Sequence, residues 1–175
     1  MTPVDRAFRP LLGLPCWGVE WNAQTGLWLE FGNPRLTIHE PSGGTARSER
    51  VRRMSAYRRV AVHGRWTLAV MCGRWTLKLR DQAGVTAESE GSDRSTALRY
   101  LDGQRLVSAD VGAADGATRL VFDLGAELTI DGSDCDEGEM WTLYKPRHTV
   151  LSVRSDGTYG SGASAKSRRW LPLPR

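Results

Sequence analysis

A chain of 175 residues with 40% hydrophobic and 25% charged residues has the composition of one ordinary globular domain. Its 24 basic and 20 acidic side chains give a formal net charge of +4, which is too small to indicate a nucleic-acid-binding protein by itself. Only three of the basic residues are lysines, namely Lys78, Lys145 and Lys166. No apolar run is long enough for a signal peptide or a membrane span, so we expect a cytoplasmic protein that does not contact membranes.

The cysteine pattern predicts free thiols and neither a disulfide framework nor a zinc site. Cys16, Cys72 and Cys135 are too few and too scattered for a disulfide framework or a zinc site, and no C-x-x-C occurs. This pattern favours a reducing compartment. Cys16 and Cys72 alternate with apolar residues, which predicts buried free thiols.

The N-terminal region predicts strands. Residues 1–12 read as a lead-in that packs onto the body, and strands at 16–21 and 27–31 are separated by a short hairpin loop. Residues 32–35 then form either a turn or a bulge within a continuing strand. We favour the bulge, because in the second half of the chain residues 120–130 keep one parity of apolar positions, as one long strand would.

The segment 41–57 has the composition of an insertion or long loop, and such loops often carry function. Arginines crowd its second part and the residues that follow, so a solvated loop and a contact surface are both consistent with it. The candidate binding residues are Arg47, Arg50, Arg52, Arg53, Arg58 and Arg59.

Residues 58–80 show the clearest alternation in the chain. The row on one face of the first strand contains Val60, Val62, Trp66, Leu68 and Val70. A two-residue turn at 72–73 would pair this strand with residues 75–79 and bring the apolar side chains of both strands to one face. We therefore expect a β-hairpin here.

One helix, at about 93–102, is predicted in the middle of the chain, with a capping residue before it and Gly103 after it. Strands follow it, and residues 161–175 read as a flexible basic tail that is either disordered or docked by Trp170 and Leu171. The predicted strands of this half lie near 105–111, 118–130, 140–145 and 149–154.

Short motifs recur in order along the chain, which suggests an internal duplication. The echoed pairs are Leu36–Ile38 with Leu128–Ile130, Trp66–Leu68 with Trp141–Leu143, and Leu77–Arg80 with Leu151–Arg154. We therefore predict a single β-rich domain over 1–160, mainly β, an antiparallel barrel or sandwich built from two similar halves at about 11–91 and 101–160 with the helix between them.

No constellation in the sequence names a reaction. The histidines, His39, His63 and His148, lack metal-ligand spacing, and the acidic run 131–139 does not match a calcium loop. No nucleophile elbow and no phosphate-binding glycine loop occurs. We therefore expect no cofactor, no metal and no catalytic residue.

Two alternatives to a protein-binding role stay open. The first is a barrel that binds a single nucleic-acid strand through its arginines and exposed aromatic rings, where the facing of Trp17, Trp28 and Trp141 is undecided. The second and weaker one is an enzyme with a pocket in the barrel mouth, lined by Glu40, His63 or Asp110.

Several stretches together resemble a family of small single-domain bacterial proteins of unknown function. They are GLPCWGVEW, LEFGNPRLTIHEP, RRVAVHGRWTL, YLDGQRLVS, FDLGAELTI and WTLYKP with VLSVRSDGTY. The resemblance covers about residues 11 to 160 and implies no activity and no catalytic residue. Taken with the surplus of charged loops, the sequence predicts a non-enzymatic intracellular binding module, immunity-like or accessory in role, that contacts another protein.

Overall fold

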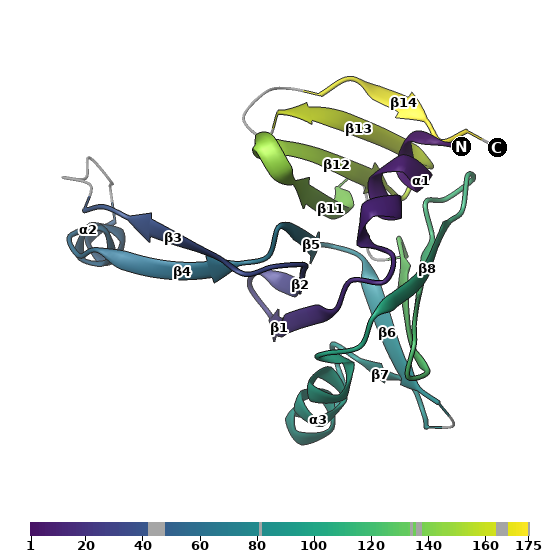
Figure 1. Cartoon of the computed structure of the whole chain (residues 1–175), viewed down its shortest axis with the longest axis horizontal. Coiled ribbons are helices and arrows are strands. Elements are labelled where there is room, and N and C mark those ends of the chain that lie inside the picture. Colours follow the sequence, from purple (N-terminus) through teal and green to yellow (C-terminus); the bar gives the residue numbers. More distant parts are fainter. Residues whose placement is uncertain (42–47, 81, 134, 136–137, 164–167, 175) are drawn as a thin grey trace.

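The computed structural model describes residues 1–41, 48–80, 82–133, 135, 138–163 and 168–174. Within these residues the chain forms two antiparallel β-sheets and a separate two-stranded ribbon, as Figure 1 shows. The prediction of a mainly β, antiparallel fold with a short helix between the halves is confirmed. Both large sheets are open rather than closed into barrels, an arrangement compatible with a sandwich.

The larger sheet has seven strands, in the spatial order β1-β2-β5-β11-β12-β13-β14. Their bounds are β1 Cys16–Asn22, β2 Gly26–Phe31, β5 Trp66–Val70, β11 Glu139–Lys145, β12 Thr149–Arg154, β13 Thr158–Ala163 and β14 Trp170–Pro172. The predicted first hairpin is confirmed, since β1 and β2 pair antiparallel with Asn22 opposite Gly26.

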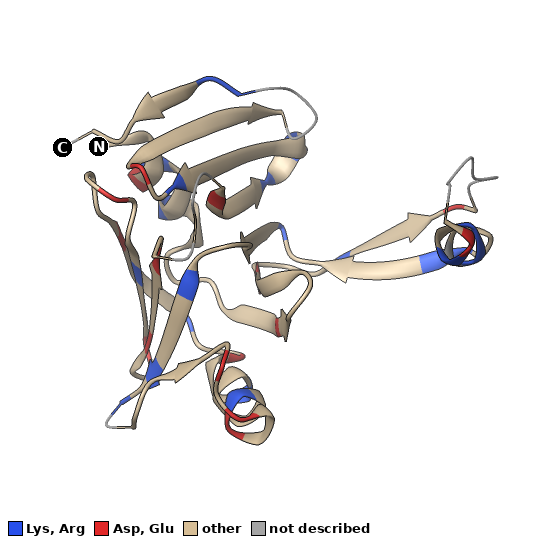
Figure 2. Ribbon diagram, turned by 180° about the vertical axis from the view of Figure 1, so that it is seen from behind, with Lys and Arg blue, Asp and Glu red and all other residues tan. Residues whose placement is uncertain are grey.

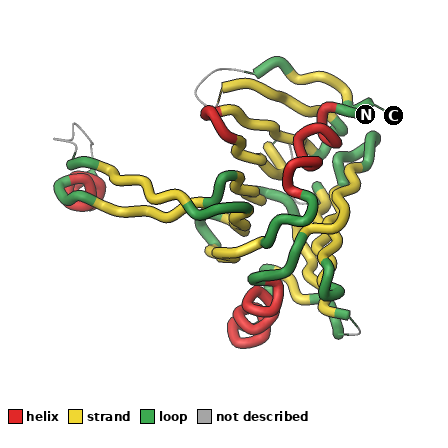
Figure 3. Tube along the Cα trace, in the orientation of Figure 1, coloured by secondary structure: helices red, strands yellow, loops and turns green. Residues whose placement is uncertain are grey.

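The smaller sheet has five strands, in the order β7-β6-β10-β9-β8. Their bounds are β6 Arg74–Leu79, β7 Val85–Thr86, β8 Leu106–Val111, β9 Thr118–Phe122 and β10 Ala126–Asp131. The ribbon consists of β3 Arg35–His39 and β4 Arg59–His63. The helical segments are α1 Pro3–Phe8, η1 Arg9–Leu11, α2 Glu49–Ser55, α3 Gly91–Leu101 and η2 Pro146–His148 (Figure 3).

The core forms where the alternating apolar residues of both sheets meet. In the larger sheet the buried row includes Leu29, Leu68 and Leu143, which lie in register on neighbouring strands. The N-terminal lead-in packs here as predicted: Phe8 is buried and its ring meets that of Trp141 edge-on, with centroids 5.6 Å apart. Burial of these rows stabilises the fold by removing apolar surface from water.

The prediction that residues 66–79 form a β-hairpin is wrong. Both strands exist, but β5 pairs with β2 and β11, whereas β6 pairs with β7 and β10. The chain turns a corner at 71–73 and passes from one sheet into the other, and it returns between β10 and β11. The apolar alternation was read correctly, but each row fits more than one neighbouring strand, so the pattern alone did not determine the partner.

A disulfide joins the two segments in which the chain passes from one sheet to the other. Cys72 and Cys135 are bonded, with their Cα atoms 5.5 Å apart, so the expectation of a free thiol at Cys72 is wrong. The cysteines are distant in sequence, and only the two corners bring them together. Cys16 is the buried free thiol that was predicted, and burial raises the pKa of that thiol far above its usual range. The cysteine argument for a reducing compartment is therefore removed.

The echoed motifs do not occupy equivalent places. Trp66–Leu68 and Trp141–Leu143 lie on adjacent strands of one sheet, with Leu68 opposite Leu143. Leu77 lies on β6 of the smaller sheet and Leu151 on β12 of the larger one. In each sheet the strands from before α3 and those from after it form two adjacent groups, which meet at β5 and β11 in the larger sheet and at β6 and β10 in the smaller one. Two of the three motif pairs nevertheless fall on strands of different sheets, so the pairs mark no repeated unit of the structure.

Two turns were also missed. Residues 118–131 form two paired strands, β9 and β10, rather than one long strand, and Gly125 turns between them with φ +90°. Gly32 turns in the same way with φ +76°, so residues 32–34 end β2 and no bulge continues it. The parity of the apolar positions carries straight through Gly125, which hid that turn from the sequence pattern. At Gly32 the parity shifts between Phe31 and Leu36, and this shift was interpreted as a bulge instead of a turn.

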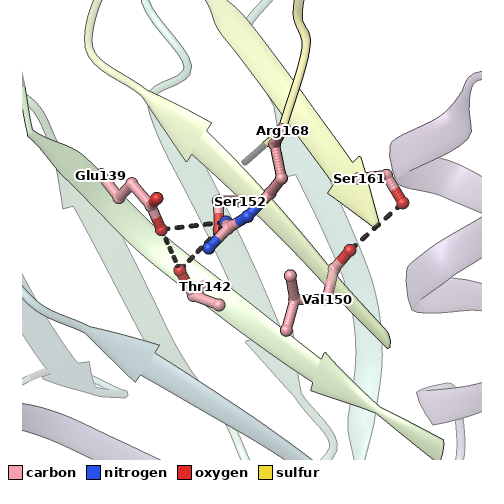
Figure 4. Close-up of polar contacts among 6 residues, drawn as sticks. All are labelled: Glu139, Thr142, Val150, Ser152, Ser161 and Arg168. Carbon is pink, nitrogen blue, oxygen red and sulfur yellow. Dashed lines mark hydrogen bonds and ion pairs between the residues drawn. The ribbon is translucent and has the colours of Figure 1, made fainter. Parts of the chain in front are cut away.

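The C-terminal segment is docked rather than free where it is described. β14 pairs with β13, Leu173 is buried, and Trp170 stacks under the Arg154 guanidinium at 3.7 Å. Figure 4 shows Arg168 reaching across the sheet, where it donates hydrogen bonds to Ser152 Oγ and, at 3.1 Å, to Glu139 Oε2. A Cβ on Gly160 would lie 3.2 Å from Arg168 Cβ. The glycines read as a flexible linker thus leave room for this arginine.

Candidate functional site

The ribbon of β3 and β4 projects from the two sheets as an arm, with α2 at its far end (Figure 1). Among the described strands, β3 and β4 pair only with each other. A two-stranded ribbon in water is marginally stable unless something packs on it. The arm, defined as residues 35–41 and 48–65, is therefore the first place to look for a contact surface.

One face of the arm is apolar and uncovered. The register places Leu36 opposite Val62 and Ile38 opposite Val60, so these four side chains share a face of the ribbon. They are between 53% and 65% exposed. Contiguous exposed apolar patches on soluble proteins commonly mark interaction sites. We call these four residues the apolar stripe.

The opposite face of the ribbon is polar. Arg35 lies opposite His63, Thr37 opposite Ala61, and His39 opposite Arg59. All of these residues except Ala61 are exposed. The arm therefore has the alternation of apolar and polar residues that is typical of a strand with one buried face. No other described element covers its apolar face.

Positive charge gathers at the far end. The described residues of the arm contain seven arginines and two glutamates, and Figure 2 shows the blue cluster on α2. Exposed apolar side chains accompany the cluster, namely Val51 on α2 and Tyr57 just after it. The arm thus combines an apolar stripe with a basic tip, which suits a surface that is apolar and acidic.

The structure gathers most of the predicted binding residues in this tip. Arg50, Arg52 and Arg53 lie on α2 and are exposed, and Arg59 begins β4. Arg58 is engaged already, because its guanidinium donates to both carboxylate oxygens of Glu40 at 2.9 to 3.1 Å. The sixth candidate, Arg47, lies outside the described residues.

A buried carboxylate holds the base of the arm. Glu30 on β2 accepts a hydrogen bond from the Gly64 backbone N–H at 2.8 Å and another from Thr67 Oγ1 at 2.6 Å. His63 Nδ1 lies 3.5 Å from the other Glu30 oxygen. A Cβ on Gly64 would lie 2.7 Å from the backbone nitrogen and oxygen of Phe31, so only glycine fits at this junction. These contacts fix where β4 leaves the body and β5 begins.

The sequence contained the apolar stripe but placed it wrongly. Val60 and Val62 were assigned to one continuous row with Trp66 and Leu68, and that row was expected to be buried. The strand breaks at Gly64, so the first part of the row lies on the arm and the second part in the core. Gly64 between two halves of an apolar row was the signal that could have indicated the break.

The residues proposed for a catalytic pocket do not converge. Glu40 pairs with Arg58 on the arm, His63 lies at the base of the arm beside Glu30, and Asp110 is on β8 of the smaller sheet. They line no common cavity among those found in the described residues.

Metal binding finds no support in the described part of the chain, where no group of three potential ligands comes together. The acidic run 131–139 is divided. Asp131 accepts hydrogen bonds from Ser133, and Glu139 pairs with Arg168. Asp134, Asp136 and Glu137 lie outside the described residues.

The three undecided tryptophans lie in different settings. Trp141 is fully buried and donates to Thr118 Oγ1, so it belongs to the core. Trp17 and Trp28 are half-buried and donate their indole N–H groups to backbone carbonyls. Trp28 also stacks on Tyr144, with ring centroids 6.2 Å apart. None of the three lies on the arm beside the arginine cluster.

No family model, no curated protein and no solved structure matches this chain. Its resemblance to a family of small bacterial proteins therefore stays a prediction. Across the described residues, no helix is both long enough and apolar enough to span a lipid bilayer.

Proposed function

We propose that this protein is a non-enzymatic binding module that uses the arm to dock on an acidic partner protein. The observation that carries the proposal is the apolar stripe, which the fold leaves exposed along a ribbon whose base is anchored by Glu30. Placing four aliphatic side chains in water is unfavourable, and a partner that covers them recovers that free energy. An immunity-like or accessory role is consistent with a protein that works by such contact.

The charge of the arm supports an acidic partner. Seven arginines against two glutamates on the described arm repel a second copy of the same surface, so a symmetric pairing of two arms is disfavoured. An acidic surface with an apolar groove complements both features. The arginines would accelerate encounter, and the stripe would supply most of the affinity.

The test compares a variant in the apolar stripe with a variant at an exposed strand position on the body. Replacing Ile38 and Val60 together by serine removes a facing pair from the stripe, whereas Val107→Ser removes an equally exposed valine from β8 of the body. If each stripe residue contributes about 1 kcal/mol on burial, the double variant binds roughly 30-fold more weakly. The affinity of the Val107→Ser control for the partner should stay within a factor of two of the wild-type value.

The partner is first cross-linked to wild-type protein in the native host, and affinities are then measured with the purified pair. Thermal unfolding of both variants checks that neither change acts through the fold. Equal binding by the double variant and the wild type, or a captured partner with no acidic surface, would sink the proposal.

Single-stranded nucleic acid is the second candidate, favoured by Arg50, Arg52 and Arg53 beside the exposed Tyr57. Nucleic-acid binding predicts a different response to substitutions. Alanine at the three arginines together should weaken binding of a fluorescent oligonucleotide, and affinity should fall steeply with salt. The serine changes in the stripe should leave that binding intact, because aliphatic side chains do not stack on bases in the way aromatic rings do.

A further inference from the structure

A second feature lies on the body, away from the far end of the arm. A hollow of about 440 Å³ opens between the N-terminal helical segment and the hairpin of β11 and β12. This volume is enough for a small molecule, which would lie in a hollow that is widely open to solvent. It is lined by Pro3, Arg6, Ala7, Pro10, Trp66, Lys145, Pro146 and Thr149.

The charged groups of the hollow are all positive. Arg6 and Lys145 line it, and no acidic side chain does. Neither of these two side chains has a hydrogen bond or an ion pair with any residue that the structure describes. Burial lowers the pKa of the Lys145 ammonium below its usual range.

Apart from Thr149, the remaining lining residues are apolar: Ala7, Trp66 and three prolines. The Arg65 guanidinium lies over the Trp66 ring, 5.0 Å from its centroid. The adjoining turn holds Arg147 and His148 at φ +64° and +56°. Non-glycine residues with positive φ cost free energy, and such strain gathers at functional sites.

We propose that this hollow binds a small aromatic carboxylate, whose ring packs on Trp66 and the prolines while its charge is met by Lys145 and Arg6. An anion there would neutralise cations that the protein itself leaves unpaired, and a planar body would fill the apolar walls. The site is separate from the apolar stripe and does not depend on what the arm binds.

Lysine acetylation followed by mass spectrometry tests the site, with 2-naphthoate as the ligand and 2-naphthol as its neutral counterpart. Lys78 is the internal reference, because it is exposed on β6. At saturating 2-naphthoate, acetylation of Lys145 should slow at least fivefold, while that of Lys78 changes less than twofold. Equal protection of both lysines, or equal protection by 2-naphthol, would overturn the proposal.

Affinity for 2-naphthoate provides the second measurement. Lys145→Met and Arg6→Gln should each weaken calorimetric binding about tenfold or more, and Lys78→Met should not. Arg6 is exposed, so its variant keeps the assay interpretable if Lys145→Met unfolds. The Ile38→Ser and Val60→Ser variant should bind 2-naphthoate normally, which separates this result from the arm's function. Protection of Lys145 by an arm-bound partner protein and not by 2-naphthoate would also refute the small-anion site.

Discussion

Removing the carboxylate of Glu30 should loosen the arm and destabilise the fold. Glu30 is 7% exposed, and its carboxylate accepts from the Gly64 N–H and the Thr67 hydroxyl. In Glu30→Ala both donors lose a charged acceptor, and hydrogen bonds to charged groups contribute about 1.5 to 3 kcal/mol each. Because the Thr67 hydroxyl can rotate to another acceptor, we expect a total loss of roughly 3 kcal/mol, which lowers the melting temperature by about 6 to 12 °C.

The assay has a global and a local readout. Urea unfolding gives the change in the free energy of unfolding, and hydrogen exchange at the Gly64 amide reports whether the base of the arm opens. The matched control is Glu127→Ala, which removes a half-buried carboxylate paired with the exposed Arg119 at 2.7 Å on the smaller sheet. Exposed ion pairs contribute little, so the control should unfold almost as the wild type does. If Glu30→Ala is no more destabilised than the control, or if exchange at Gly64 is unchanged, the reasoning about the anchor is wrong.

Two further predictions concern the C-terminal segment and the disulfide. Burial raises the pKa of Glu139, but hydrogen bonds in its network and the charge of Arg168 outweigh this and lower it. The stabilisation that ionised Glu139 gives to the docked C-terminal segment is therefore complete at pH values above the ordinary glutamate pKa. It is lost as the pH falls through the lowered pKa. Trp170 fluorescence should follow that loss, and Glu139→Gln should remove the acid dependence; an identical acid profile in the variant would contradict this. Replacing Cys72 and Cys135 by serine should lower the free energy of unfolding by about 4 kcal/mol, because the bond closes a loop with a sequence separation of 63. A loss below about 1 kcal/mol in urea unfolding would contradict this.

The sequence predicted the elements better than their partners. The alternation at Leu68 and Leu77 identified β5 and β6 correctly, and the apolar positions around residue 98 together with Gly103 identified α3. The predicted capping residue was wrong, because the helix already begins at Gly91 and Glu90 precedes it without a side-chain cap. Alternation records which face of a strand is apolar, and it carries no information on which other strand lies beside it. The hairpin proposed between β5 and β6 failed for that reason.

The candidate site was half visible in the sequence. Six arginines near the insertion pointed to the arm, and the structure places three of them on α2, Arg59 at the start of β4 and Arg58 directly before it. The apolar stripe was not recognised, because an exposed valine and a buried one look the same in a periodic row. Exposure depends on what other parts of the chain cover a side chain, so it becomes known only when the whole fold is present.

By itself, then, the sequence determined the class of the fold, the helix α3 in the middle of the chain and the lack of any recognised catalytic motif, because these depend on local periodicity and composition. The short helices α1 and α2 were not predicted. Tertiary structure decided the rest. It joined Cys72 to Cys135 across two corners, divided the row at Gly64 between arm and core, and brought Lys145 and Arg6 to one hollow. Each of these outcomes depends on contacts between residues far apart in the chain, such as Gly64 with Glu30, and no local pattern encodes such contacts.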